Sequence, residues 1–253
     1  MTVAPEPRRA TAAETGDNRL LSDPPTYVCK QAGQSITVDG VLSETAWQKA
    51  EPIELVLREG TGKPKLPTTA KMLWDNEALY VAFVCTDTDI WATMTQHDDP
   101  LWEQEVVEVF IDPTGTADPY FEIQVNPLNV VVDLRLVKSL AGLGKRMFAW
   151  NASTMKTAVK TTAPVNTWQV SDNPRGQWTV EMAIPFKDLD TLPHSPPQDG
   201  DKWRVNLYRI ERPALKKDED DEYSAWAPTY YSPSYHTVER FGVLVFSAAP
   251  VGK

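Results

Sequence analysis

The chain has few cysteines, no excess of basic residues and no long hydrophobic run, and each shortage excludes a class of protein. Its 253 residues include two cysteines, Cys29 and Cys85, which we interpret as buried free thiols rather than a disulfide framework or a Cys-rich zinc site. The net charge of −10 argues against nucleic acid, whose phosphates call for a basic face. No apolar run approaches membrane-spanning length. We therefore expect neither nucleic acid nor a membrane as a partner.

The two ends of the chain differ from its middle. Residues 1–24 have low hydrophobicity and no periodicity, which predicts a disordered tail, and residues 248–253 are predicted to be a second short tail. The first 21 residues contain no apolar segment of the signal-peptide kind, so the sequence leaves the cellular compartment open. Residues 25–247 contain no linker and no internal repeat, and we expect them to form one domain.

Short alternating segments separated by turns make up most of this domain. A single short helix is expected at 43–50, with Ser43 as its N-cap, and a helical turn at 186–189. A long acidic and aromatic loop is expected at 213–236. The predicted strands are 27–29, 36–38, 53–58, 68–74, 78–86, 102–112 after an initial turn, 120–126, 129–137, 155–160, 167–171, 177–184, 202–211 and 241–246. This pattern predicts an all-β protein, an antiparallel β-sandwich with very little helix.

Polar side chains share one face of neighbouring predicted strands. In the segment 102–112 the apolar Val107, Val109 and Ile111 alternate with a second set of polar residues, Gln104, Glu108 and Asp112. The next segment repeats the pattern, with Phe121, Ile123 and Val125 inward and Glu122, Gln124 and Asn126 outward. The same parity places Asp133, Arg135, Arg204 and Asn206 outward. A flat polar face with Trp102 at its edge suits a polyhydroxylated ligand, because the indole stacks on an apolar sugar face while amides and carboxylates hold hydroxyls.

Several segments resemble, in order, the family 9 carbohydrate-binding modules and their relatives. The resemblance covers about residues 26–247, and the segments that carry it are Ile36–Trp47, Trp74–Phe83, Trp102–Asp112, Phe121–Asn126, Trp178–Pro185 and Phe241–Leu244. Members of this family are antiparallel β-sandwiches that bind sugars, often the ends of plant polysaccharides, and are commonly attached to secreted glycoside hydrolases. The resemblance therefore implies non-catalytic binding of a mono- or oligosaccharide, with no cofactor required. A structural calcium ion is a frequent companion in the family, but the resemblance does not place its ligands here.

The resemblance also implies roles for individual residues. Trp102 matches the stacking Trp of sugar-binding members, and Glu108 matches their hydroxyl-binding Glu. A second Trp usually closes over the sugar, and Trp226 is the best candidate for it. Gln124 stands where some members have an Arg, so the sugar preference is expected to differ. The remaining candidates for sugar contact are Glu122, Asn126, Arg135 and Asn206.

Three alternatives remain open at this point. A glycoside hydrolase needs two carboxyl groups across one cleft, which Glu108 and Glu122 could supply from adjacent strands. Some relatives with this sandwich bind haem, and the available axial ligands here are His97, Met94 and His236. The Gln at position 124 leaves room for a protein-interaction scaffold with a degenerate sugar site. The partner protein of such a scaffold is unknown.

Overall fold

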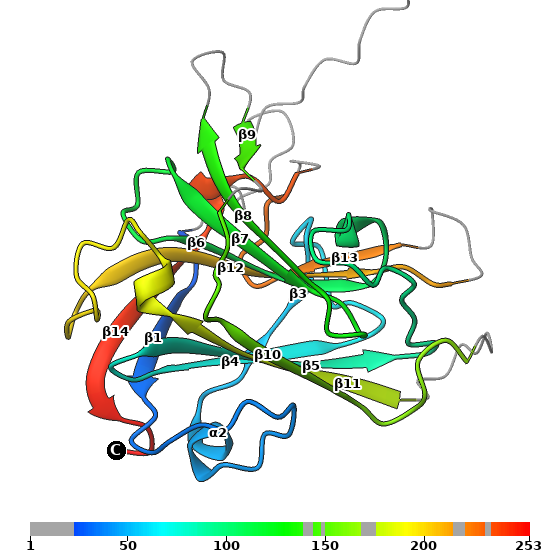
Figure 1. The fold of residues 1–253 in the computed structure, drawn as a ribbon, viewed down its shortest axis with the longest axis horizontal. Coiled ribbons are helices and arrows are strands. Elements are labelled where there is room, and N and C mark those ends of the chain that lie inside the picture. The colour runs from blue at the N-terminus through cyan, green and yellow to red at the C-terminus, as the bar shows by residue number, and fades with distance from the viewer. Residues whose placement is uncertain (1–22, 139–143, 148–149, 168–175, 215–220, 231–233) are drawn as a thin grey trace, which may run out of the picture.

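Two layers of β-strands face each other in the described part of the chain (Figure 1). The computed structural model describes residues 23–138, 144–147, 150–167, 176–214, 221–230 and 234–253. Residues 1–22 of the predicted N-terminal tail and most of the predicted strand at 167–171 therefore lie outside the described residues. The all-β class is confirmed, and the longest α-helix among the described residues is α2, Thr45–Lys49. No helix in these ranges has the length and apolar character needed to cross a membrane.

The lower layer in Figure 1 contains four neighbouring strands. In spatial order these are β10 (Lys156–Thr161), β11 (Gly176–Pro185), β5 (Ala78–Asp87) and β4 (Thr68–Trp74). Each is antiparallel to its neighbour. The sharp turn between β4 and β5 is the hairpin predicted from Asp75–Glu77, and it is closed by a hydrogen bond from Asp75 N to the Ala78 carbonyl at 3.1 Å.

The upper layer carries the polar strands of interest. Its order is β12 (Lys202–Glu211), β6 (Val106–Asp112), β7 (Tyr120–Val125), β8 (Val131–Lys138) and β9 (Gly144–Met147), all antiparallel. β1 (Thr26–Gln31) and β14 (Gly242–Pro250) run parallel to each other and connect the two layers at one side. The short β13 (Glu222–Ala225) pairs with β12 and with β3 (Val56–Leu57), and β2 (Ile53–Glu54) pairs with β4.

The main hydrophobic core lies between the layers. It contains the apolar residues that alternate along β6 and β7, including Val107, Val109 and Ile123, all fully buried. Large side chains of the lower layer, such as Phe83 and Trp178, pack against them. The period-two pattern read from the sequence therefore assigned the inward face of these central strands correctly.

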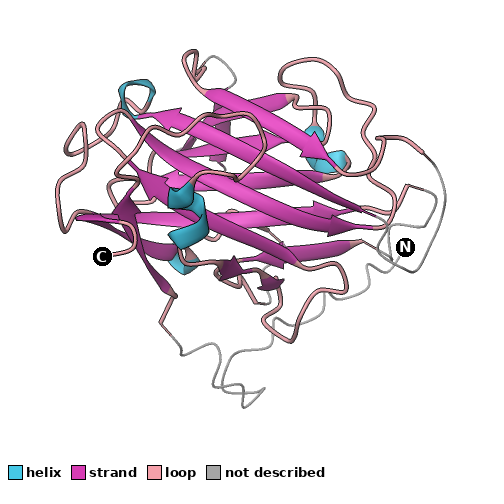
Figure 2. Ribbon diagram, turned by 90° about the horizontal axis from the view of Figure 1, so that it is seen from below, coloured by secondary structure: helices cyan, strands magenta, loops and turns pink. Residues whose placement is uncertain are grey.

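Both outer faces of the sandwich are also covered. On the lower layer, Ala46 and Trp47 of α2 pack against Leu73, Tyr80 and Ala82, and Figure 2 shows the short helices on the outside of the strands. On the upper layer, Tyr235, Val238 and Phe241 pack over a second apolar cluster built around Phe110 and Tyr208. The predicted flat and open polar face is therefore wrong, because the chain after β13 returns across it.

Several local expectations differ from the structure. Glu44 rather than Ser43 is the N-cap of α2, and its side chain makes no capping hydrogen bond. Residues 36–38 form no strand, since they pack beside the helix on the outer face. β13 lies inside the predicted loop at 213–236. β14 continues to Pro250, three residues beyond the expected end of the domain, because it keeps pairing with β1 as far as Gln31.

Candidate functional site

A cavity of about 280 Å³ opens over the outer face of β6 and β7. Its floor comes from these strands, and its walls come from the turn before β6 and from the chain around β13. The residues that line it are Arg58, Trp102, Glu108, Phe110, Glu122, Gln124, Ile210, Arg212, Tyr223, Ser234, Tyr235 and His236. Four of the residues predicted for the site therefore lie in one cavity: Trp102, Glu108, Glu122 and Gln124.

Strand register brings the three polar floor residues together. Glu108 of β6 lies opposite Gln124 of β7, and Glu122 lies two residues further along the same face of β7. Gln124 Nε2 donates a hydrogen bond to Glu122 Oε1 at 2.5 Å. All three side chains are at most 2% exposed, because the covering segment shields them from bulk water. Gln124 Oε1 is buried and has no hydrogen-bond partner among the described residues, so it keeps an acceptor for a ligand.

Trp102 forms an aromatic edge of the cavity. It belongs to the short 3₁₀ helix η2, Leu101–Glu103, which turns the chain into β6. Its side chain is half-buried against the apolar cluster on the outer face, and its carbonyl accepts a hydrogen bond from Arg212 Nη2 at 3.3 Å. Apolar contacts therefore hold the Trp102 side chain, and a hydrogen bond holds its backbone. Part of the indole remains accessible.

The cavity also contains two arginines and a histidine: the sequence did not indicate Arg58 or Arg212 as site residues, and it indicated His236 only as a possible haem ligand. The Arg58 guanidinium lies 4.4 Å from the centre of the Tyr223 ring. Arg212 forms an ion pair with Asp221. His236 Nδ1 lies 2.7 Å from the Tyr120 hydroxyl and 3.9 Å from Glu122 Oε2. The aromatic-rich segment after residue 222 was the one sequence feature that could have indicated these cavity residues. It has no periodicity, however, from which to predict which of its side chains point into a cavity.

Two tyrosines stiffen the covered wall. The Tyr208 and Tyr235 rings stack with their centres 3.9 Å apart, and the Tyr208 hydroxyl donates to the Tyr235 carbonyl at 2.8 Å. Burial raises the pKa of both hydroxyl groups well above the ordinary value. Both phenols therefore stay protonated and act as neutral hydrogen-bond donors in the wall.

The structure does not bring Trp226 to this cavity. Its side chain is 8% exposed and packs in the core between the layers, edge-on to Tyr27 at 6.4 Å. The backbone explains this placement, because Trp226 N donates to the Leu207 carbonyl and continues the pairing of β13 with β12. The expectation that Trp226 stands opposite Trp102 is therefore corrected.

Arg135 also lies on the other face of its sheet. On β8 it pairs with Phe121, whose side chain is in the main core, and its Nε lies 3.5 Å from Asp190 Oδ1. The face that β8 shares with Glu122 and Gln124 carries Val132, Leu134 and Leu136 instead. The prediction that Asp133 and Arg135 share the outer face with Glu122 and Gln124 is wrong. Both faces of β8 are covered, so the alternation of polar and apolar residues does not show which face is the outer one.

The two asparagines among the candidates stabilise the backbone. Asn126 Oδ1 accepts hydrogen bonds from Leu128 N at 3.0 Å and Val130 N at 2.9 Å, which closes the turn between β7 and β8. Asn206 Oδ1 accepts from Ala227 N at 2.9 Å. Neither residue lines the cavity. The sequence correctly placed the Asn206 side chain on the outer face of β12. Its amide, however, is hydrogen-bonded to the backbone of Ala227 in the segment that covers this face.

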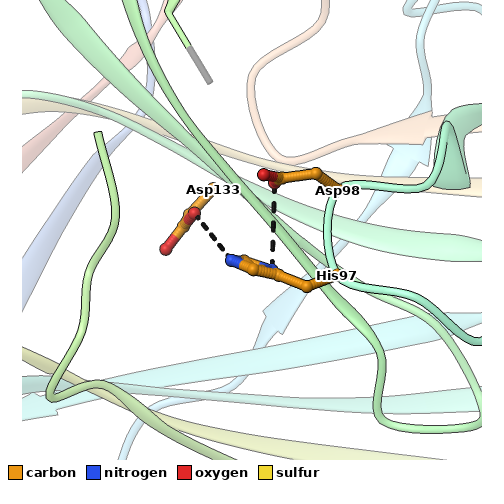
Figure 3. A group of neighbouring side chains, drawn as sticks. All are labelled: His97, Asp98 and Asp133. Atoms are coloured by element: carbon orange, nitrogen blue, oxygen red, sulfur yellow. Dashed lines mark ion pairs between the residues drawn. The ribbon is translucent and has the colours of Figure 1, made fainter. Parts of the chain in front are cut away.

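The three residues considered as haem ligands are dispersed. His236 lines the cavity, whereas His97 and Met94 do not. Figure 3 shows His97 between two carboxylates, with Nε2 3.4 Å from Asp133 Oδ1 and Nδ1 3.8 Å from Asp98 Oδ1. His97 Nδ1 also lies 2.9 Å from the Val131 carbonyl. The imidazole is thus held at the surface by its own neighbours, away from the cavity over β6 and β7.

Comparison with known proteins shows which family this chain matches. A family model described as "Carbohydrate family 9 binding domain-like" matches residues 38–248. Endo-1,4-beta-xylanase A of Thermotoga neapolitana is 26% identical over 164 residues, a match that spans 62% of this chain and 13% of the xylanase.

Solved structures from Bacteroides uniformis and Caldicellulosiruptor kristjanssonii are among those with a similar fold. A putative carbohydrate-binding protein from Bacteroides uniformis has a TM-score of 0.67 at 16% identity, covering 88% of this chain and 100% of that one. A carbohydrate binding module family 9 from Caldicellulosiruptor kristjanssonii, in complex with cellotriose, has a TM-score of 0.58 at 15% identity, with 88% and 94% covered. Its complex with glucose has a TM-score of 0.58 at 14% identity, with 90% and 98% covered. At these identities the likeness establishes the sandwich fold.

Proposed function

Because the chain belongs to the carbohydrate family 9 binding domain-like family, we propose that the cavity over β6 and β7 binds a mono- or oligosaccharide without converting it chemically. The observation that carries this proposal is the meeting of one accessible indole, Trp102, with three polar floor residues, Glu108, Glu122 and Gln124, in a single cavity. The structural neighbours in complex with cellotriose and glucose support a sugar as the ligand class.

The residues at the edge and on the floor of the cavity would make different contacts with a sugar. Trp102 offers a ring that stacks on the C–H face of a pyranose, which contributes roughly 1 kcal/mol beyond area burial by analogy with aromatic pairs. Glu108 and Glu122 accept hydrogen bonds from sugar hydroxyls, and Gln124 Oε1 provides a further buried acceptor. Hydrogen bonds to charged groups are worth about 1.5–3 kcal/mol each. A cavity of about 280 Å³ is small, so one sugar ring fits inside and further rings extend outward.

Titration calorimetry of the full chain with glucose and with cellotriose tests this proposal. We expect binding in the micromolar to millimolar range, since a small sugar buries little area. Trp102→Ala should weaken binding at least about tenfold, and Glu108→Gln by about ten- to a hundredfold, from the energies of stacking and charged hydrogen bonds. Val28→Ala, on the exposed side of β1, is the control and should bind like the parent.

Two results would contradict the proposal. Equal sugar affinity in the parent, Trp102→Ala and Glu108→Gln chains would place the ligand elsewhere. Release of reducing sugar from cellotriose during incubation would make the cavity catalytic, with Glu108 and Glu122 as the carboxyl pair. Because the chain spans 13% of the xylanase it matches, hydrolysis by that relative carries no weight for this domain.

A further inference from the structure

A histidine and two aspartates meet where the loop before η2 contacts the start of β8 (Figure 3). One ligand atom from each of His97, Asp98 and Asp133 lies within 4.8 Å of the others. The Asp133 side chain is 2% exposed, whereas the side chains of His97 and Asp98 are 43% and 29% exposed. The group therefore has a buried carboxylate at its base and an open side that a small ion can enter from the solvent.

The backbone determines which nitrogen of His97 carries the proton. His97 Nδ1 lies 2.9 Å from the Val131 carbonyl, which can only accept, so Nδ1 is the donor. A neutral ring protonated at Nδ1 has a lone pair at Nε2. Asn151 Nδ2, a donor, lies 3.2 Å from this second nitrogen. Histidines that bind metals commonly have this arrangement, with one ring N–H donated to a backbone carbonyl and the other nitrogen directed at the ion.

Asp133 places a second acceptor opposite this lone pair. Its Oδ1 lies 3.4 Å from His97 Nε2, is buried, and accepts no hydrogen bond from any described residue. Its Oδ2 accepts from Ala152 N at 2.7 Å, so the carboxylate is fixed. Asp98 Oδ1 is also buried and has no hydrogen-bond partner in the described part of the chain. Charge-assisted hydrogen bonds to carboxylates measure about 2.7–2.9 Å. Two acceptors that face each other across a longer distance indicate a positively charged ligand between them.

We propose that His97 Nε2, Asp133 Oδ1 and the Asp98 carboxylate bind a divalent cation of the zinc type. A mixed set of imidazole and carboxylate donors suits zinc, whereas calcium and magnesium take oxygen ligands. An ion about 2.0–2.2 Å from two atoms that are 3.4 Å apart sees them at roughly 110°, the tetrahedral angle. Rotation of the exposed Asn151 amide would offer Oδ1 as a further ligand, and water can complete the coordination from the open side.

A zinc ion at this position would fasten the loop before η2 to β8. The Val131 carbonyl already accepts from Asp98 N at 3.0 Å and from His97 Nδ1. The ion adds bonds from side chains on both elements, and it should raise the melting temperature because it binds the folded chain. None of the three proposed ligands lines the cavity over β6 and β7, so this inference does not rest on the proposed function.

Correlation spectra of the imidazole ¹⁵N and ¹H nuclei in the full, chelator-stripped chain test the site at the proposed ligand atom. The chain has three histidines, so single substitutions assign every signal. At neutral pH we expect the metal-free His97 ring to be protonated at Nδ1. ZnCl₂ should shift its Nε2 resonance and leave Nδ1 protonated. Excess Mg²⁺ in the buffer competes for groups made of oxygen ligands alone.

Titration calorimetry with ZnCl₂ measures the contribution of each ligand. We expect His97→Ala and Asp133→Asn each to lose at least about tenfold in Zn²⁺ affinity and to lose the Zn²⁺-dependent rise in melting temperature. Asp133→Asn keeps an oxygen that can accept from Ala152 N. His194 supplies the matched control, because its side chain is 45% exposed and its Nδ1 lies 2.9 Å from one carboxylate, that of Asp201. His194→Ala should keep both Zn²⁺ responses.

Three results would overturn the proposal. The first is a set of His97 resonances that Zn²⁺ leaves unchanged, and the second is parent affinity in His97→Ala or lost affinity in His194→Ala. The third is a His97 ring that carries two protons and keeps both when Zn²⁺ is added, which would show an ion pair with the two aspartates in place of a metal site. If Asp133→Asn fails to fold, His97→Ala decides, since the His97 ring is exposed.

Discussion

Asn206 of β12 holds both backbone groups of Ala227 with its side-chain amide. Its Nδ2 donates to the Ala227 carbonyl at 2.8 Å, and its Oδ1 accepts from Ala227 N at 2.9 Å. The same Nδ2 lies 2.6 Å from the Tyr208 hydroxyl, which donates to the Tyr235 carbonyl. One amide therefore connects the strand to both ends of the chain segment that covers it, and the covering segment supplies a wall of the cavity.

Replacing this amide should destabilise the wall rather than remove a ligand contact. Asn206→Ala leaves buried backbone groups of Ala227 without their partner, which costs about 1–3 kcal/mol. Urea denaturation should show a lower midpoint with an unchanged slope, while Gln96→Ala, at an exposed amide, should unfold like the parent. An unchanged midpoint combined with lost sugar binding would instead make Asn206 a direct sugar contact.

Much of the fold was predictable because apolar residues recur at every second position along a strand that has one face in the core. β6 and β7 are central strands with an apolar face in the core, so alternation located Glu108, Glu122 and Gln124 on one surface. The hairpin at Asp75 and the helical turn at Phe186 followed from turn and proline signals. Each of these features depends on residues close together in the sequence.

The rest of the site depends on contacts that sequence spacing does not encode. Period two separates two faces but does not say which face a distant segment covers, and this is why the side of Arg135 was misread. Trp226 stands in a segment without periodicity, and a backbone bond to Leu207 decides where its ring goes. Arg58 and His236 reach the cavity only through the pairing of β3 with β13 and the return of the chain over β12.

Trp226 and Trp102 should respond oppositely to substitution. Trp226 fills the main core, and a Cβ at Gly242 would lie 2.6 Å from its ring, so the space is closely packed. Trp226→Phe should therefore lower the free energy of unfolding by about 1–3 kcal/mol and leave the sugar dissociation constant within about twofold of the parent. Calorimetry and urea denaturation of this variant beside Trp102→Ala separate the two roles. Loss of sugar binding by folded Trp226→Phe would restore Trp226 to the site.

Glu181 should make stability depend on pH. Its carboxylate accepts from Trp47 Nε1 at 2.8 Å and from the backbone N–H groups of Asp39 and Gly40, which attaches α2 and its preceding turn to β11. Burial nevertheless raises the pKa of Glu181 above its usual 4.5. A carboxyl with a raised folded pKa stabilises the folded chain fully below the unfolded pKa, and this contribution is lost as the pH rises through the folded pKa.

Comparison with Glu181→Gln isolates this effect. The free energy of unfolding of the parent minus that of Glu181→Gln should be largest below the usual pKa of 4.5 and should fall as the pH rises above it. Trp47→Phe removes a hydrogen bond that lowers the pKa of Glu181, so it should extend the fall to higher pH. Urea denaturation at several pH values gives these differences. A parent-minus-variant difference that grows with pH would mean that the hydrogen bonds outweigh burial.

Both cysteines should be inert in the folded chain. Cys29 and Cys85 are free and fully buried, as the sequence led us to expect. Burial raises the pKa of Cys29 well above the ordinary value and that of Cys85 to about 12, despite the nearby Arg209. Since the thiolate is the reactive form, an aromatic disulfide reagent at pH 8 should release almost no chromophore from the native chain and two equivalents in urea. Val28→Cys, beside Cys29 but 52% exposed, should add one fast equivalent. Rapid release from the native parent would show that the sandwich opens far more readily than its packing implies, because only an opening of the core exposes either sulfur.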